Sequence, residues 1–358
     1  MQIDRSSLAC ARARALPLLA AALLACTLAP ARGVAAHRLS APAVPLVLYS
    51  AQGYDSTMAK AYTATGAAKV SLVDDSTGNI LARIQAEKNN PHWDIVWFDG
   101  DGTMRSLADQ KLLLTNWTPA NSASYTALGK KLVPADHAYF PTGVTAAGVI
   151  IYNTKKLTGA QAPKDWTDLL TPRFKDAVAE NDPAFSGPAY PYIAGQIYRQ
   201  GAGNIAKGEG FFTALKANGL KIFQTNDPTL HSVQTGARLV GVVQDSAYYA
   251  AAATGAPIGV VYPKGGVTSL PGVIAINAKS PHLMAAEAFV NYVLSQTGQQ
   301  KMVHDPNDSD SYYTPLIAGI TPLPSVKSAV SSFQALDPIW AGAHATEIKS
   351  WFHSNIVQ

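Results

Sequence analysis

The sequence predicts an α/β protein with two lobes, in which strands and helices alternate along one chain. Short β-branched stretches alternate with amphipathic stretches from residue 44 onward, which is typical of strands and helices arranged in layers. About 320 of the 358 residues follow a predicted export segment, and a compact domain usually holds about 100 to 200 residues. No internal repeat or long linker separates independent domains in the sequence. Two lobes joined by crossing strands are therefore expected.

Residues 1–36 are predicted to be a signal peptide. Three arginines precede an apolar run over residues 15–28, and small residues end at Ala36, after which we expect cleavage. A lipid-modified Cys26 is the alternative that the surrounding residues support less well. The run is too short to span a bilayer comfortably, and no later window offers about 18 unbroken apolar residues. We therefore expect a periplasmic protein.

Cysteine content and charge narrow the class of protein further. Both cysteines, Cys10 and Cys26, lie in the export segment, so the mature chain is expected to have no disulfide and no thiolate ligand. Four arginines and one aspartate in that segment account for +3 of the net charge of +4, which leaves about +1. The mature sequence has no polybasic patch that would favour nucleic acid.

Each expected strand is a β-branched or aromatic run that small polar residues interrupt. Strands are expected at residues 44–49, 70–73, 94–98, 148–152, 220–223, 239–243 and 258–261. Helices are expected after residue 53, after residue 78, and near 166–170, 193–198, 285–294 and 345–352. Crossing strands near 138–145 and 262–270 are expected to join the lobes. Lobe 1 then comprises residues 37–142 and 270–358, and lobe 2 comprises residues 143–269.

Small polar loops follow the first three expected strands and open helices. They cover residues 50–53, 75–78 and 99–102. In open α/β sheets, ligands bind beside such loops at the carboxyl ends of the strands. We expect the three loops to converge on one edge of the sheet.

Hydroxyl groups stand at two expected helix starts. Ser76, Thr77 and Gly78 open a helix in the first lobe, and Ser186 and Gly187 open one in the second. Hydroxyls and free backbone N–H groups at a helix N-terminus suit an anionic oxygen. A plain N-cap explains each segment alone, but their repetition in both lobes favours a site for a phosphate-like or carboxylate group.

Acidic and phenolic groups offer a second kind of chemistry. Asp99 and Asp101 end a strand without an adjacent lysine or arginine, so they form either a solvated turn or a site for a cationic amine or a hard metal ion. Tyr248 and Tyr249 can stack a ligand or, when deprotonated, bind ferric iron. Alternatively, one ring packs between the lobes while the other is half exposed.

Enzyme motifs are absent from the sequence. The eight histidines are scattered from His37 to His353 without a His-Glu-x-x-His motif, and there is no Gly-x-Ser-x-Gly elbow or phosphate loop. The acidic segment 305–310 lacks the glycine and glutamate of a calcium loop, so we interpret it as a polar turn. A secreted hydrolase stays a remote alternative because missing motifs are weak evidence against chemistry.

Eight segments together resemble the periplasmic substrate-binding proteins of ABC importers, in the branch that contains ferric-ion, phosphonate, sugar-phosphate and thiamine binders. They are LYSAQ (48–52), DSTG (75–78), AEKNNP (86–91), DIVW (94–97), IYNTKKL (151–157), WTDLL (166–170), VYPK (261–264) and AEAFV (286–290). The resemblance covers nearly all of the mature chain. It is specific for the superfamily.

The resemblance implies the type II periplasmic-binding-protein fold, in which a hinge of two crossing strands joins two α/β lobes and the ligand cleft lies between them. The lobes close on a small-molecule ligand as open and closed states exchange population. The closed form docks on an inner-membrane permease, which its ATPase drives. This implies a monomer with no cofactor and no enzymatic activity. A sensor's extracellular subunit would use the same closure with a different partner.

The resemblance also bears on the ligand. Ferric binders use a histidine after the first strand, a glutamate after the third strand and a tyrosine pair. This sequence keeps Tyr248 and Tyr249, but Gly53 stands near the histidine position and Asp99 near the glutamate position, with Tyr54 as a substitute ligand. The departure makes ferric iron, bound by Tyr248, Tyr249, Asp99 and Tyr54, the alternative hypothesis.

Phosphonate and phosphate-ester binders are the resemblance we favour. This resemblance rests on the two helix starts and on LPGVI (270–274). It implies that the anionic group of the ligand binds at the two helix N-termini and that an amine, if the ligand has one, faces Asp99. We therefore predict a solute-binding importer component for a small anionic or zwitterionic, phosphonate-like solute. The predicted ligand-binding residues are Ser50, Gln52, Ser76, Thr77, Gly78, Asp99, Thr142, Ser186, Gly187, Tyr248 and Tyr249.

Overall fold

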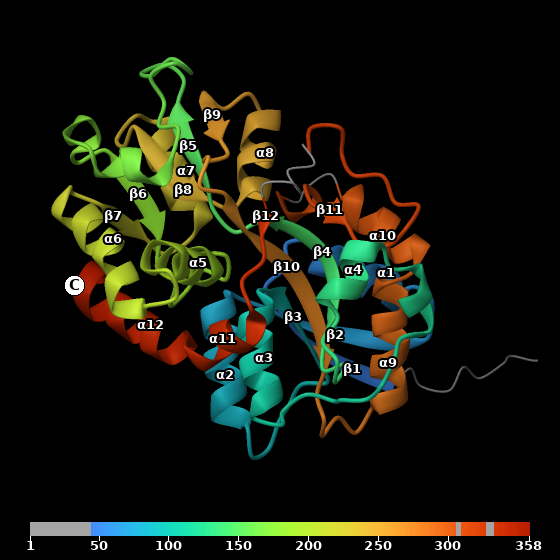
Figure 1. The fold of residues 1–358 in the computed structure, drawn as a ribbon. Coiled ribbons are helices and arrows are strands. Elements are labelled where there is room, and N and C mark those ends of the chain that lie inside the picture. The colour runs from blue at the N-terminus through green and yellow to red at the C-terminus, as the bar shows by residue number, and fades with distance from the viewer. Residues whose placement is uncertain (1–43, 306–308, 327–332) are drawn as a thin grey trace, which may run out of the picture. The chain divides into compact units, whose positions relative to one another are not determined.

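Two β-sheets with flanking helices make up the part of the chain that the computed structural model describes, which is residues 44–305, 309–326 and 333–358 (Figure 1). The predicted signal peptide, including Cys26, lies outside the described residues. We call each sheet with its helices a lobe. None of the helices in the described ranges is long and apolar enough to cross a membrane.

Lobe 1 contains a seven-stranded sheet with the order β11-β4-β10-β3-β1-β2, to which β12 is added beside β10. Its strands are β1 (Val44–Ser50), β2 (Ala68–Asp74), β3 (Ile95–Asp99), β4 (Phe140–Ala146), β10 (Val267–Ile276), β11 (Thr314–Pro315) and β12 (Phe333–Gln334). Its helices are α1 (Asp55–Thr63), α2 (Thr77–Glu87), α3 (Asp101–Asp109), α4 (Ala127–Leu132), α9 (Leu283–Val293) and α10 (Gln296–Val303).

Lobe 2 contains a five-stranded sheet with the order β7-β6-β8-β5-β9. Its strands are β5 (Val149–Asn153), β6 (Val178–Asn181), β7 (Lys221–Phe223), β8 (Val240–Val243) and β9 (Ile258–Val261). Its helices are α5 (Ala189–Gly201), α6 (Ile205–Ala217), α7 (Asn226–Gln234) and α8 (Asp245–Ala253). The helix expected at residues 166–170 is a single 3-10 turn, Trp166–Leu170, which Asp165 and Asp168 close with a capping box.

The direction of the strands places the polar loops of lobe 1 together. β1 runs parallel to both β2 and β3, so the carboxyl ends of all three strands lie at one edge of the sheet. The helix that follows β2 shows why the sequence turns there: the Ser76 hydroxyl accepts the Asn79 N–H at 3.3 Å, and Ile80 and Ile84 bury one face of α2. The three loops therefore meet at one edge, as predicted.

Two strands pass between the lobes, which confirms the predicted hinge. β4 and β10 are antiparallel neighbours in the sheet of lobe 1. β4 continues into β5 of lobe 2, and β9 of lobe 2 returns into β10 (Figure 1). Because both connections are short, a rotation of one lobe against the other needs changes in only a few backbone angles.

The C-terminal helices contact both lobes. α11 (Pro338–Ala343) packs on α3, where a Cβ atom on Gly102 would lie only 2.6 Å from the Ala341 Cβ. α12 (Ala345–Phe352) lies along α5, and its Ile348 and Phe352 are buried in the core of lobe 2 (Figure 1). The segment 270–358, which we predicted to belong to lobe 1, thus ends in a helix whose apolar face lies in the core of lobe 2.

Candidate ligand cleft

A cleft with a volume of about 490 Å³ lies between the strand ends of lobe 1 and the loops of lobe 2. The lobe 1 wall consists of residues 51–53, 74–77, Asp99 and Asp310, and the lobe 2 wall consists of residues 185–188, 225–227 and Gln244. This size suits a small organic molecule or a hydrated ion.

The cleft brings together part of the predicted site. The predicted residues that line it are Gln52, Ser76, Thr77, Asp99, Ser186 and Gly187. The predicted residues that do not line it are Ser50, Gly78, Thr142, Tyr248 and Tyr249. Thr142 is fully buried and accepts from the Trp97 indole at 3.2 Å, and Ser50 accepts the Gln52 N–H at 3.2 Å, so both side chains support the wall from behind.

Asp99 lines the cleft at the carboxyl end of β3. Its Oδ1 accepts from the Gln52 side-chain amide at 3.0 Å, and its Oδ2 accepts from the Gln244 side-chain amide at 3.3 Å. Burial, reinforced by the nearby charge of Asp310, raises the pKa of Asp99 to about 7. The two amides hold the carboxyl in place, but they do not neutralise its charge.

Gln244 and Asp310, two lining residues that the sequence interpretation missed, interact with Asp99. Gln244 follows β8 of lobe 2 and also donates to Thr145 Oγ1 on the hinge strand β4 at 3.0 Å. Asp310 accepts the Gly53 N–H at 2.7 Å across 257 residues of sequence. Gln244 obeys the strand-end rule that we applied only to lobe 1, so the rule would have found it. Asp310 belongs to the segment that we interpreted as a polar turn.

The cleft is strongly acidic. Its lining includes the five carboxyl groups of Asp74, Asp75, Asp99, Asp227 and Asp310. Among the residues that the structure describes, no lysine, arginine or histidine lines it. Burial raises the pKa of Asp310 and of Asp74, each with a neighbouring carboxylate as a further cause. The cleft therefore has a negative potential, which the sequence prediction of an anionic head did not anticipate.

The start of α2 is already capped within the protein. Asp75 Oδ1 accepts the Ser76 N–H at 2.7 Å and the Asn79 side-chain amide at 2.8 Å, and Gly78 N–H donates to the Phe185 carbonyl at 3.3 Å. Several donors that we expected to hold an anion are thus engaged. The cleft can still offer a ligand a hydroxyl or backbone contact from Thr77 of lobe 1 and from Ser186 or Gly187 of lobe 2.

Gly78 and Gly187 form a seam where the two lobes touch. A Cβ atom on Gly78 would clash with the Ala184 carbonyl oxygen of lobe 2, and one on Gly187 would lie 2.5 Å from Thr77 Oγ1 of lobe 1. The two glycines allow the backbones to approach closely. Their predicted role as direct ligand contacts stays a prediction, whereas their place in the seam is a feature of the described structure.

The residues of the ferric hypothesis are spread over two places. The Tyr54 hydroxyl donates to Gln52 Oε1 at 2.6 Å beside the cleft. The Tyr249 hydroxyl lies 2.8 Å from that of Tyr262, and the ring of Tyr248 lies beside Tyr249 with a centroid distance of 5.3 Å. Tyr262 in turn donates to Asp245 at 2.9 Å. In the described ranges, no group of three or more His, Cys, Asp and Glu side chains is arranged to hold a metal ion.

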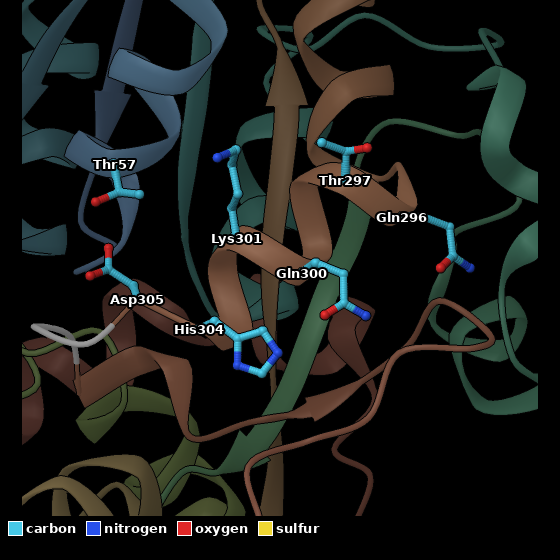
Figure 2. A pocket seen from close by; sticks show the side chains of 7 residues that line it. All are labelled: Thr57, Gln296, Thr297, Gln300, Lys301, His304 and Asp305. Carbon is cyan, nitrogen blue, oxygen red and sulfur yellow. The ribbon is translucent and has the colours of Figure 1, made fainter.

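A larger hollow of about 710 Å³ lies on lobe 1 away from the cleft, beside α1 and α10 (Figure 2). It is lined by Thr57, Gln296, Thr297, Gln300, Lys301, His304 and Asp305. It is open to solvent, and it contains none of the predicted site residues. Size alone therefore does not identify the ligand site, whereas the smaller cleft joins both lobes at the strand ends.

The fold and the position of the cleft define a solute-binding protein of the two-lobed class. The chain belongs to the family of bacterial extracellular solute-binding proteins, whose sequence profile matches residues 57–333. The predicted resemblance to the periplasmic binding proteins of ABC importers and the predicted two-lobed fold are both confirmed.

Three known proteins illustrate the similarity. The chain is 26% identical over 274 residues to a probable ABC transporter periplasmic-binding protein, y4fP, of Sinorhizobium fredii, which is 75% of each chain. It is similar in structure to the periplasmic binding protein AfuA of Actinobacillus pleuropneumoniae with fructose-6-phosphate bound, with a TM-score of 0.76, 20% identity, and 87% of this chain and 98% of that chain covered. For iron-bound HitA of Pseudomonas aeruginosa the TM-score is 0.74 at 21% identity, with 86% and 98% covered. At these identities, the two structures support the fold and not the ligand.

Proposed function

We propose that this protein is the periplasmic solute-binding component of an ABC importer and that it captures a small zwitterionic, phosphonate-like solute by closure of its lobes. The observation that carries the proposal is the cleft between the strand ends of lobe 1 and the loops of lobe 2 in a member of the extracellular solute-binding family. The lobes close around the solute without converting it, so the protein has no enzymatic turnover. The protein acts as a monomer, because both lobes that close on the solute belong to the same chain.

The ligand lies with its amine towards Asp99 and its anionic group towards the hydroxyls of Thr77 and Ser186 and the backbone at Gly187. The negative potential of the cleft supports the zwitterionic form of the ligand over a purely anionic one, because a net anion would meet five carboxyl groups and no lining cation among the described residues. Ser76 contributes less, because its hydroxyl already accepts the Asn79 N–H.

The closed protein delivers the solute to an inner-membrane permease, which is coupled to its ATPase. Family membership supports this partner, as does the similarity to y4fP, which is described as a probable ABC transporter periplasmic-binding protein.

A thermal-shift screen of the protein from His37 onward tests the proposal. The panel contains 2-aminoethylphosphonate, phosphate esters, ferric citrate and thiamine. A ligand present at 100 times its dissociation constant adds about 2.7 kcal/mol of stability. Small-angle scattering on the shifted sample should show a smaller radius of gyration, because closure compacts the two lobes. Turnover of any chromogenic ester that Ser186→Ala abolishes would instead establish a hydrolase.

Ferric iron is the outcome that would replace the zwitterion. It would require the hydroxyls of Tyr248 and Tyr249 to leave their present surroundings and reach the cleft. A visible tyrosinate colour with ferric citrate, lost in Tyr248→Phe, would overturn the zwitterionic proposal and leave the transport class intact.

A further inference from the structure

A buried asparagine of lobe 2 holds two residues of the cleft wall from behind. Asn181 ends β6, is only 4% exposed and does not line the cleft. Its side-chain amide donates to Asn226 Oδ1 at 2.7 Å and, through a longer bond of 3.4 Å, to Ser186 Oγ, and both of these residues line the cleft. Its Oδ1 accepts the Thr229 hydroxyl at 2.6 Å. One buried amide is therefore bonded to two side chains that a ligand can reach.

The Thr229 hydroxyl fixes which way the Asn181 amide points. A separation of 2.6 Å is usual for an O–H···O hydrogen bond and short for a bond with a nitrogen donor, so the carbonyl oxygen of Asn181 faces Thr229. Thr229 is fully buried and lies three residues after Asn226 on α7, which places both side chains on the face of that helix towards β6. The NH2 group of Asn181 therefore points to the cleft wall.

The direction of these bonds decides what the lobe 2 wall offers to a ligand. A side-chain amide accepts through its oxygen and donates through its nitrogen. Because the oxygen of Asn226 accepts from Asn181, the side-chain N–H groups of Asn226 are left for the cleft, and Ser186 Oγ, which also accepts, directs its own O–H away from Asn181. Within the described ranges, neither these N–H groups nor this O–H has an acceptor. The wall thus presents hydrogen-bond donors.

We infer that Asn181 is a positioning residue, which turns the donors of Asn226 and Ser186 into the cleft and so makes lobe 2 select a ligand group that carries acceptor oxygens. This inference rests on the proposed function, since it concerns the lobe 2 wall of the same cleft. Asn181 itself does not touch the ligand. The donors that it directs explain how a cleft with no lining lysine, arginine or histidine among the described residues holds an anionic oxygen.

The orientation is tested first without any ligand. In the 15N-labelled protein from His37 onward, NMR measures how fast the side-chain amide hydrogens exchange with water. The Asn181 hydrogens are expected to exchange roughly 100-fold more slowly than both hydrogens of Asn226, because only the Asn181 amide is buried and donates within the protein. A protected Asn226 hydrogen would show that Asn226 donates to Asn181. That result would overturn the inference and leave the proposed function standing.

Asn181→Asp reverses the wall. The carboxylate keeps an acceptor for Thr229 but replaces the NH2 group with a second acceptor, so Asn226 and Ser186 turn their hydrogens away from the ligand. Calorimetric titration with 2-aminoethylphosphonate is expected to show binding about thirtyfold weaker than in the wild-type protein. Asn181→Ala frees the two side chains without reversing them, so its expected loss is about threefold. Equal losses in the two variants would make Asn181 a merely structural residue and overturn the inference.

Asn153→Asp is the matched control. Asn153 is also a buried asparagine of lobe 2, but its amide donates to the Val233 carbonyl at 2.7 Å and does not line the cleft. Urea unfolding should show a loss of stability in Asn153→Asp as in Asn181→Asp, whereas affinity for 2-aminoethylphosphonate should stay within about twofold of the wild-type value. An affinity loss in Asn153→Asp as large as in Asn181→Asp would contradict the positioning role.

Thr229→Val tests the same network if Asn181→Asp fails to fold. Valine keeps the size of the side chain and removes only the donor that orients Asn181, so we expect 2-aminoethylphosphonate to bind about threefold more weakly. Unchanged affinity would contradict the inference. If 2-aminoethylphosphonate does not bind the wild-type protein while the exchange rates are as expected, the phosphonate-like solute of the proposed function is wrong and the donor wall stands.

Discussion

Asp99 of lobe 1 and Asp245 of lobe 2 are both buried aspartates at the carboxyl end of a strand, yet their partners differ. Asp245 follows β8, and its oxygens accept the Ala146 N–H at 2.9 Å and the Tyr262 hydroxyl at 2.9 Å. The Tyr262 hydroxyl is itself 2.8 Å from that of Tyr249. Within the described part of the chain, the donors to Asp99 are two side-chain amides, and the carboxyl faces the cleft.

The comparison teaches that position at a strand end does not by itself make a carboxyl group functional. Asp245 binds the last residue of the hinge strand β4, so it fixes the place where the chain enters lobe 2. Its donors come from within the fold. Among the residues that the structure describes, the surroundings of Asp99 supply hydrogen bonds but no cation, and this difference supports a structural role for Asp245 and our proposal that Asp99 binds the ligand.

The largest expected effect is on stability at Asp245. Asp245→Ala leaves the Ala146 N–H and the Tyr262 hydroxyl without their acceptor, so we expect the free energy of unfolding to fall by roughly 3 kcal/mol. Urea unfolding of the ligand-free protein measures this change. Asp99→Asn is the control and should stay within about 1 kcal/mol of the wild-type protein at pH 5, where both side chains are largely uncharged. Equal losses in the two variants would remove the contrast between the two aspartates.

The same contrast shows how far the sequence could predict the molecule. β1, β2, β3 and β5 are β-branched runs, so their pattern predicted them directly. β6 was missed because it ends in Glu180 and Asn181, which favour turns or solvent; the fold buries them and supplies partners such as the Tyr192 hydroxyl, which donates to Glu180 at 2.7 Å. Tertiary contacts thus override local preference at this strand.

For the site, we used the rule that ligands bind at the carboxyl ends of the strands in an open α/β sheet. This strand-end rule predicted Gln52, Thr77 and Asp99, because it needs only the positions of the strands in the sequence. It could not predict Asp310, which reaches Gly53 from a segment 257 residues away. It also could not tell that Tyr249 faces Tyr262, since two adjacent tyrosines on a helix point to different surroundings that only packing decides. The sign of the cleft's potential, which depends on Asp227 and Asp310 together, was beyond the sequence for the same reason.

A smaller effect is expected from pH. Burial raises the pKa of Asp99 from its ordinary value of 3.8 to about 7 in the folded protein. Between these two pH values, the Asp99 carboxyl is therefore mostly protonated in the folded state and mostly ionised in the unfolded state. The free energy of unfolding therefore falls as pH rises from about 4 to about 7.

The Asp99→Asn variant has no carboxyl at this position and so lacks this pH dependence. Burial also raises the pKa of Asp245 to about 6, but Asp245 titrates in both proteins, so its contribution cancels when their free energies of unfolding are compared. The stability of the wild-type protein relative to Asp99→Asn should drop by on the order of 2 kcal/mol between pH 4 and pH 8. Urea unfolding of both proteins at five pH values measures the difference. A difference that stays constant with pH would mean that Asp99 titrates normally and is not held in a buried, uncompensated state.

The next effect concerns the seam beside Asp99 and leaves the region of Asp245 untouched. Gly78→Ala places a methyl group against the Ala184 carbonyl of lobe 2, so the lobes cannot approach as closely. We expect ligand affinity to fall about tenfold, or about 1.4 kcal/mol. Scattering with saturating ligand should show a larger radius of gyration than for the wild-type protein. Gly210→Ala, on α6 with open space around it, is the matched control: it should leave the affinity and the radius of gyration unchanged, while the higher helix propensity of alanine raises the free energy of unfolding by roughly 0.5 to 1 kcal/mol.

The smallest expected effect is at Tyr248, in the region of Asp245. Its ring lies beside Tyr249 and against the core of lobe 2, and burial raises the pKa of its hydroxyl, which opposes the tyrosinate that a ferric site needs. Tyr248→Phe removes only that hydroxyl, so we expect ligand affinity to change by less than twofold. Tyr262→Phe, which removes the donor to Asp245, should lower stability by about 1 kcal/mol and leave affinity similarly unchanged. A large loss of affinity in Tyr248→Phe alone would place the ligand beside Tyr248 and Asp245, and would contradict our proposal that it binds in the cleft beside Asp99.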